Sequence, residues 1–254
     1  YSGKYIPKKY INSILLKLKS FRLFQIINET SFKTKLTKSF LIVALFIIPI
    51  VAYLFFALGK NNFAKLPTVT ENVPELPNFK TQNDSVVQLK NKITILGFPG
   101  NDINDVKGNI TNLCHKIYSK NMEFVDFQVV YVAPKGTEAE INKILETLSR
   151  DADLSKWFFV FATPEEIDDY YSKLNLVGGL DSDLGTPNVF LIDKELNLRG
   201  RKGTNKKGVE EYREGYDTTS AADLHNEMSD DVKVILAEYR LALKKNNKEE
   251  NITR

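Results

Sequence analysis

The sequence contains a single cysteine, Cys114, and only two histidines among its 254 residues. A single thiol cannot form an internal disulfide, and disulfide exchange requires a thiolate together with a second sulfur. Copper(I) likewise selects soft sulfur ligands. Neither the spacing of a phosphate-binding P-loop nor that of a twelve-residue calcium-binding loop occurs. The composition therefore excludes dithiol chemistry within this chain and leaves few candidates for any other catalytic site.

Charge is absent from the apolar run Phe40–Gly59, which predicts a transmembrane helix over residues 39–59. Pro49 lies near its middle, where a membrane helix tolerates proline. A buried core helix rarely needs so long an uncharged run. A cleaved signal peptide would have a shorter leading segment and a shorter apolar region. We therefore expect an uncleaved anchor.

Positive charge is concentrated before this segment. Residues 1–38 carry nine basic residues and one acidic residue, a net charge of +8, which leaves −5 for the chain after the anchor. The positive-inside rule then predicts a single-pass protein of the inner membrane, with a cytoplasmic N-terminus and a periplasmic C-terminal part. Within residues 1–38, apolar and basic residues alternate as in an amphipathic helix. Such a helix could lie on anionic lipid or dock onto another membrane subunit, and we expect no nucleic-acid partner.

The rest of the chain alternates between apolar strands and amphipathic helices. After a proline-marked spacer at residues 60–75, a small hairpin is expected around Asn83–Ser85, and a charged tail at residues 246–254. The predicted order is strand 92–98, helix 106–120, strand 126–134, helix 137–150, strand 157–162, helix 163–174, a hairpin about Lys194–Glu195, and a closing helix from 219 or 220 to about 245. This order predicts an α/β fold, in which a mixed, mostly parallel sheet has helices on both faces.

Two stretches carry a resemblance to a known family. In "GTPNVFLID", a Thr-Pro pair before a buried strand resembles the cis-proline corner of thioredoxin-like proteins, which makes Pro187 the candidate cis-proline. The anchor, the spacer and "LPNFKTQNDSVVQLKNKITILGF" are similar to the layout of the Sco/SenC copper chaperones of cytochrome oxidase assembly, in particular to single-anchor thioredoxin-like proteins of Bacteroidetes. The resemblance runs from about Leu76 to Lys244 and implies a thioredoxin-like domain at residues 76–245.

The resemblance also indicates where the chemistry of the family should lie. The two cysteines and the histidine of Sco/SenC proteins fall at Asn101, Asp105 and Gly185, and a thioredoxin cysteine pair falls at Asn101 and Asn104. None of these positions holds sulfur or imidazole, and amide or carboxylate oxygens can neither exchange disulfides nor bind copper(I). We therefore predict a vestigial site, no enzymatic activity, and no metal or other cofactor.

Two other groupings could carry chemistry. Cys114 and His115 could form a lone-thiol or metal-handling site, which would need an exposed, acidic thiol. Helix neighbours point about 100° apart, so we expect Cys114 in the core and His115 toward solvent, with His225 on the surface of the closing helix. Asp102 and Asp105 could hold calcium or magnesium, or could simply stabilise a helix N-terminus.

A basic stretch near the end of the domain is the last candidate. "GRKGTNKKG" predicts a hairpin tip that presents a docking surface to solvent, formed by Arg199, Arg201, Lys202, Lys206 and Lys207. The sequence as a whole therefore predicts a non-catalytic accessory, assembly or structural subunit of a membrane complex. A respiratory complex is the favoured host, secretion or motility machinery is the alternative, and no small-molecule substrate is expected.

Overall fold

The computed structural model of the chain describes residues 19–23, 40, 43–54, 65–205 and 207–252. The chain divides into two units, Tyr1–Asn62 and Phe63–Arg254. In the first unit, residues 19–23 and 43–54 are helical. Among the described residues, no helix has both the length and the apolar character that a membrane span requires. The predicted anchor and the predicted amphipathic helix lie partly outside the described residues, so both stay predictions.

The second unit is built on a seven-stranded mixed sheet in the order β1-β6-β5-β2-β3-β4, with β9 paired to β5. Strands β2, β3 and β4 are parallel to one another, while β5 runs antiparallel to β2. Every residue of β2 and β3 is buried, as expected for apolar strands covered on both faces. The bounds are β1 Thr68–Thr70, β2 Ile93–Pro99, β3 Phe127–Pro134, β4 Trp157–Ala162, β5 Gly185–Ile192, β6 Leu198–Arg199 and β9 Tyr216–Asp217.

Helices cover both faces of this sheet. On one face, helices α2, η1, α4, η2 and α6 pack against the odd-numbered residues of β2 and β3. On the other, α5 and the segment that includes Val73, Phe79 and Leu89 pack against the even-numbered residues of these strands. The bounds are α2 Ile103–Leu113, η1 Cys114–Tyr118, α3 Ser119–Asn121, α4 Glu138–Leu148, α5 Pro164–Ser172, η2 Asp223–Met228 and α6 Ser229–Ile252. The predicted mixed sheet with helices on both faces is thus confirmed. The spacer predicted at residues 60–75 is wrong in part, because this stretch supplies β1 to the sheet and the buried Leu66 and Val73 to the core.

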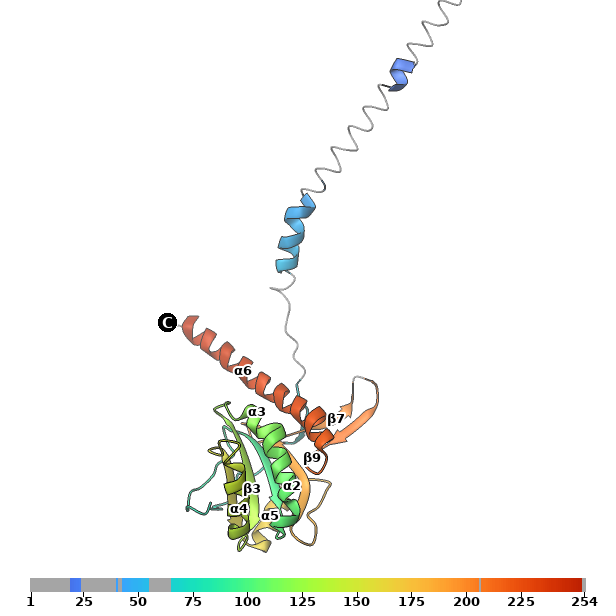
Figure 1. Cartoon of the computed structure of the whole chain (residues 1–254). Helices are drawn as coiled ribbons and strands as arrows, with labels where there is room; N and C mark the ends of the chain where they lie inside the picture. Colours follow the sequence, from blue (N-terminus) through green and yellow to red (C-terminus); the bar gives the residue numbers. More distant parts are fainter. Residues whose placement is uncertain (1–18, 24–39, 41–42, 55–64, 206, 253–254) are drawn as a thin grey trace, which may run out of the picture. The chain divides into compact units, whose positions relative to one another are not determined.

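A second, two-stranded sheet projects beside the start of α6 (Figure 1). It pairs β7 Arg201–Thr204 with β8 Glu210–Arg213, so the "GRKGTNKKG" stretch does form a hairpin tip. The smaller predicted turn around Asn83–Ser85 is also present, closed by a bridge between Lys80 and Val86. The closing helix differs from the prediction, because α6 continues to Ile252. No glycine or proline interrupts that charged segment, so nothing in its backbone chemistry ends the helix at residue 245.

Candidate functional site

The predicted site lies where β2 ends and α2 begins. Gly100 follows the strand with φ +77°, a left-handed conformation that favours glycine, and α2 starts three residues later. Asp102 is the N-cap of the helix, and its carboxylate accepts a hydrogen bond of 3.2 Å from the backbone N–H of Asp105. This carboxylate therefore serves the helix end locally.

A distant residue, Asp183, completes the same helix end. One oxygen of its carboxylate, Oδ2, accepts hydrogen bonds from the backbone N–H groups of Asn101 at 3.0 Å and Asp102 at 2.8 Å. The Asn101 side-chain amide donates to the Asp183 carbonyl at 3.1 Å. The start of a helix attracts anions because its N–H groups lack partners and its dipole is positive there. In this chain, a carboxylate of the protein itself occupies that anion position.

The loop that carries Asp183 is held by its own acidic neighbour. Asp181 Oδ1 accepts from the N–H groups of Asp183 and Gly185, each at 2.9 Å. Gly185 then enters β5 opposite Pro99, where an added Cβ would lie 3.3 Å from Gly100 Cα. The structure thus brings Gly185 against the turn that carries Asn101, as the resemblance implied. Asn104 and Asp105 are exposed on the first turn of α2.

The surroundings of this site offer little room for a ligand. The adjacent cavity, lined by Pro99, Tyr131 and Thr186 among others, has a volume of about 10 Å³, room for about one water. Across the described part of the chain, no group of three or more His, Cys, Asp or Glu side chains is placed to hold a metal ion. Asp102 is engaged as a helix cap, so the calcium or magnesium interpretation of Asp102 and Asp105 has no support in this geometry.

The prediction of a cis bond before Pro187 is wrong, because no peptide bond among the described residues is cis. Pro187 lies in β5 between the residues that pair with Gly97 and Pro99, where the register of the β2–β5 pairing shifts. Its missing N–H costs no ladder hydrogen bond at such an irregularity, so the trans strand simply continues. Its carbonyl accepts from the backbone N–H of Thr218 at 3.0 Å and from the Thr218 hydroxyl at 2.6 Å.

The single thiol does not form the alternative site. Cys114 lies in η1 with none of its surface exposed, packed in the core between the sheet and the helices. Burial raises the pKa of this thiol, and the hydrogen bond with Ser119 offsets only part of that rise. His115 is exposed, as predicted, and so is His225. A reactive thiol must be accessible and acidic, and Cys114 is neither.

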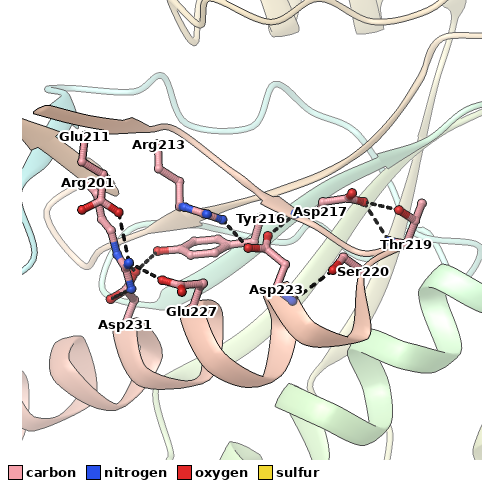
Figure 2. Close-up of polar contacts among 10 residues, drawn as sticks. All are labelled: Arg201, Glu211, Arg213, Tyr216, Asp217, Thr219, Ser220, Asp223, Glu227 and Asp231. Carbon is pink, nitrogen blue, oxygen red and sulfur yellow. Dashed lines mark hydrogen bonds and ion pairs between the residues drawn. The ribbon is translucent and has the colours of Figure 1, made fainter. Parts of the chain in front are cut away.

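The predicted basic surface contains two buried or half-buried arginines, which corrects part of that prediction. Arg199 points inward: it donates to the Leu66 carbonyl and to Asp193 at 3.0 Å, and forms an ion pair with Glu238. Arg201 is bound by Asp231, Glu227 and Glu211 (Figure 2). The sequence analysis predicted both arginines at a solvent-facing tip. It could not identify their acidic partners, because these come from α6 and other elements. Lys202 and Lys207 are exposed, as predicted, whereas Lys206 lies outside the described residues.

Comparison with known proteins yields structural likenesses only. No protein-family model matches the chain, and no curated protein matches it. Among solved structures, the chain is similar to BsSco, a member of the Sco family of cytochrome c oxidase assembly proteins, with 11% identity over 68% of this chain and 96% of that one and a TM-score of 0.49. The soluble domain of Sco1 from Bacillus subtilis has 14% identity, coverage of 66% and 97%, and a TM-score of 0.40. The thioredoxin domain of a thiol-disulfide oxidoreductase from Bacteroides vulgatus has 16% identity, coverage of 68% and 98%, and a TM-score of 0.39.

Proposed function

We propose that this chain is a non-catalytic, membrane-anchored protein with a thioredoxin-like domain, and that it acts by binding other subunits of a membrane complex. Its anchor would place the domain on the periplasmic face of the inner membrane, with the N-terminus in the cytoplasm. A respiratory complex is the favoured host, because the layout of anchor, spacer and first strand resembles that of Sco/SenC proteins. In this proposal the domain serves as an accessory, assembly or structural subunit.

The observation that carries the proposal is that the N-terminus of α2 has no thiol and is bound by a carboxylate of the chain itself. Asn101 and Asn104 stand where a dithiol would be needed, and the Asp183 carboxylate binds the N–H groups of Asn101 and Asp102. A thiolate or another external anion would have to displace this carboxylate. Since function resides in sites rather than in folds, a domain whose site is filled by its own side chain is suited to work through its surfaces.

The full-length chain, purified in mild detergent, provides the test. We expect no turnover of a dithiol reporter, no copper(I) retained after desalting, and alkylation of Cys114 only after denaturation. A Cys114→Ala variant is the matched control, because any genuine thiol activity of the wild type must vanish in it. Turnover of the reporter, or copper(I) bound in stoichiometric amount, would refute the proposal and return the thiol or metal-handling alternative.

A further inference from the structure

A cleft of about 670 Å³ lies between the β7–β8 hairpin and the start of α6, beside the predicted docking residues. Three parts of the chain form its walls: residues 65–67, the hairpin, and the η2–α6 helix. Its size lies within the range of protein ligand sites, about 300 to 1,000 Å³. The kind of ligand that it could take must be judged from the side chains that line it.

The acidic residues in the cleft share one arginine. All three that line it, Glu211, Glu227 and Asp231, form ion pairs with Arg201. Asp231 binds this guanidinium through both carboxylate oxygens, at 2.9 and 3.1 Å, and also accepts from the Tyr216 hydroxyl at 2.7 Å (Figure 2). Burial alone would lower the pKa of Arg201, but the hydrogen bonds with Asp231 and Glu211 outweigh it and raise that pKa. The floor of the cleft is therefore a fixed network in which one guanidinium binds three carboxylates, with a net charge of −2.

A second arginine fixes the position of the hairpin. Arg213, on β8, forms an ion pair with Asp223 at the start of η2, and Asp223 also accepts from the backbone N–H of Asp217 at 2.8 Å (Figure 2). Together with Arg201, it ties both strands of the hairpin to the closing helix. Side chains held on two elements that are tied in this way present a preorganised surface, which lowers the cost of ordering on binding.

Three lysines also line this cleft. Lys65, Lys202 and Lys207 are exposed, and none of them has an ion-pair partner among the described residues. Apolar contact is available beside them from Leu66, Pro67 and Val234. The lining as a whole has five cations and three acids, a net charge of +2. This positive charge, combined with apolar walls, complements a ligand that carries both carboxylates and apolar side chains.

The geometry points to this cleft as the docking site for an acidic segment of a partner protein. The inference rests on the proposed function and names the class of partner that the domain would hold. A bilayer surface rich in anionic lipid shares the negative charge, but a flat surface contacts protruding groups rather than the interior of a cleft. A protein segment can enter the cleft, place its carboxylates near the lysines and bury its apolar side chains against Leu66 and Val234.

A labelled peptide of alternating Glu, Asp and Leu is a suitable probe for the full-length chain in mild detergent, with a Gln/Asn-substituted peptide as its control. Fluorescence anisotropy should show binding of the acidic peptide only. The affinity should fall as sodium chloride rises from about 50 to about 300 mM, because salt screens exposed charges. Equal binding of the two peptides, or no binding of either, would overturn the inference.

Charge reversal at the cleft sharpens the test. The double variant Lys202→Glu/Lys207→Glu should bind the acidic peptide about tenfold more weakly or worse, since two attractions become repulsions. The control is Lys120→Glu/Lys143→Glu, which changes the net charge equally at exposed lysines on α3 and α4, outside the cleft. Equal losses in the two variants would reject the cleft in favour of a general charge effect.

Further outcomes distinguish a protein partner from a lipid surface, and failure of the cleft from failure of the proposed function. If the chain fails to bind the acidic peptide but binds phosphatidylglycerol vesicles through Lys202 and Lys207, a lipid surface replaces the protein partner and the inference is wrong. If the peptide does not bind while the dithiol and copper(I) assays stay negative, the cleft is rejected and the proposed function stands. Dithiol turnover together with intact peptide binding would reject the proposed function and leave the cleft as a binding site.

Discussion

Helices α2 and α5 both begin directly after a strand of the parallel part of the sheet, yet their first turns are completed in different ways. At α5, Thr163 and Glu166 form a capping box: the Thr163 hydroxyl accepts from the Glu166 N–H, and the Glu166 carboxylate accepts from the Thr163 N–H. Pro164 then occupies the first turn, where its missing N–H is not needed. All the groups involved lie within four consecutive residues.

At α2, the local cap is only part of the arrangement. Asp102 serves the N–H of Asp105, but the N–H groups of Asn101 and Asp102 reach Asp183, which is more than eighty residues away in the chain. The difference shows that one helix start can be stabilised by its own residues while the other depends on the loop before β5. At α2, the distant loop supplies a carboxylate to the N–H groups at the start of the helix.

Substitution at Gly100 should disturb α2 most. In Gly100→Ala, the new Cβ would lie 2.9 Å from the Asp183 carbonyl oxygen, at a residue with φ +77°. We expect the free energy of unfolding to fall by about 3 kcal/mol, from backbone strain plus displacement of the Asp183 loop. Gly208→Ala is the matched control, because Gly208 has φ +78° and open space around its Cβ. Urea unfolding measures both, and equal losses would mean that contact with the loop is unimportant.

Removal of the Asp183 carboxylate should have the next largest effect. Asp183→Ala removes the acceptor of the Asp102 N–H, while the Asn101 N–H keeps the Asp183 carbonyl oxygen at 3.0 Å. We expect a loss of about 1.5 kcal/mol in the free energy of unfolding. Asp183→Asn should lose less, since its amide oxygen can still accept from both N–H groups. Ser182→Ala, at an exposed neighbour whose side chain makes none of the described hydrogen bonds, is the control. A change in urea midpoint no larger than that of Ser182→Ala would show that α2 needs only its local cap.

The smallest effect is expected at α5, where it should depend on pH. The hydrogen bond from the Thr163 N–H, followed by the charge of Lys135, lowers the pKa of Glu166 below its usual value. The ionised form therefore stabilises the folded state above the unfolded-state pKa of about 4.3, and this contribution is lost as pH falls through the lower folded-state pKa. Glu166→Gln should be less stable than the wild type at neutral pH, and this difference should shrink in acid.

Urea midpoints at about pH 7 and about pH 3 measure that change. Glu165→Gln, at an exposed acid in the same first turn, controls for loss of charge near the helix dipole. A Glu166→Gln deficit that is independent of pH would assign the effect to geometry rather than to ionisation.

Much of the fold could be predicted because its signals are local. The apolar runs of β2, β3 and β4, the Thr-Pro start of α5 and the hairpin tip after Gly200 each lie within a few residues. Partners supplied by distant segments could not be predicted in the same way. The sequence predicts Arg199 and Arg201 as exposed basic residues because their partners Glu238 and Asp231 follow 39 and 30 residues later.

The sequence itself determined three features of this protein. They are the absence of sulfur at Asn101, Asn104 and Gly185, the burial of Cys114 on an apolar helix face, and the order of strands and helices. These depend on residue identity and on the periodicity of apolar side chains. Only the tertiary structure decided that Asp183 completes α2, that Arg201 forms ion pairs with three acids, and that Lys65 joins Lys202 and Lys207 at one cleft. The physical reason is that hydrogen bonds and ion pairs depend on proximity in space, which packing creates between segments that the sequence keeps far apart.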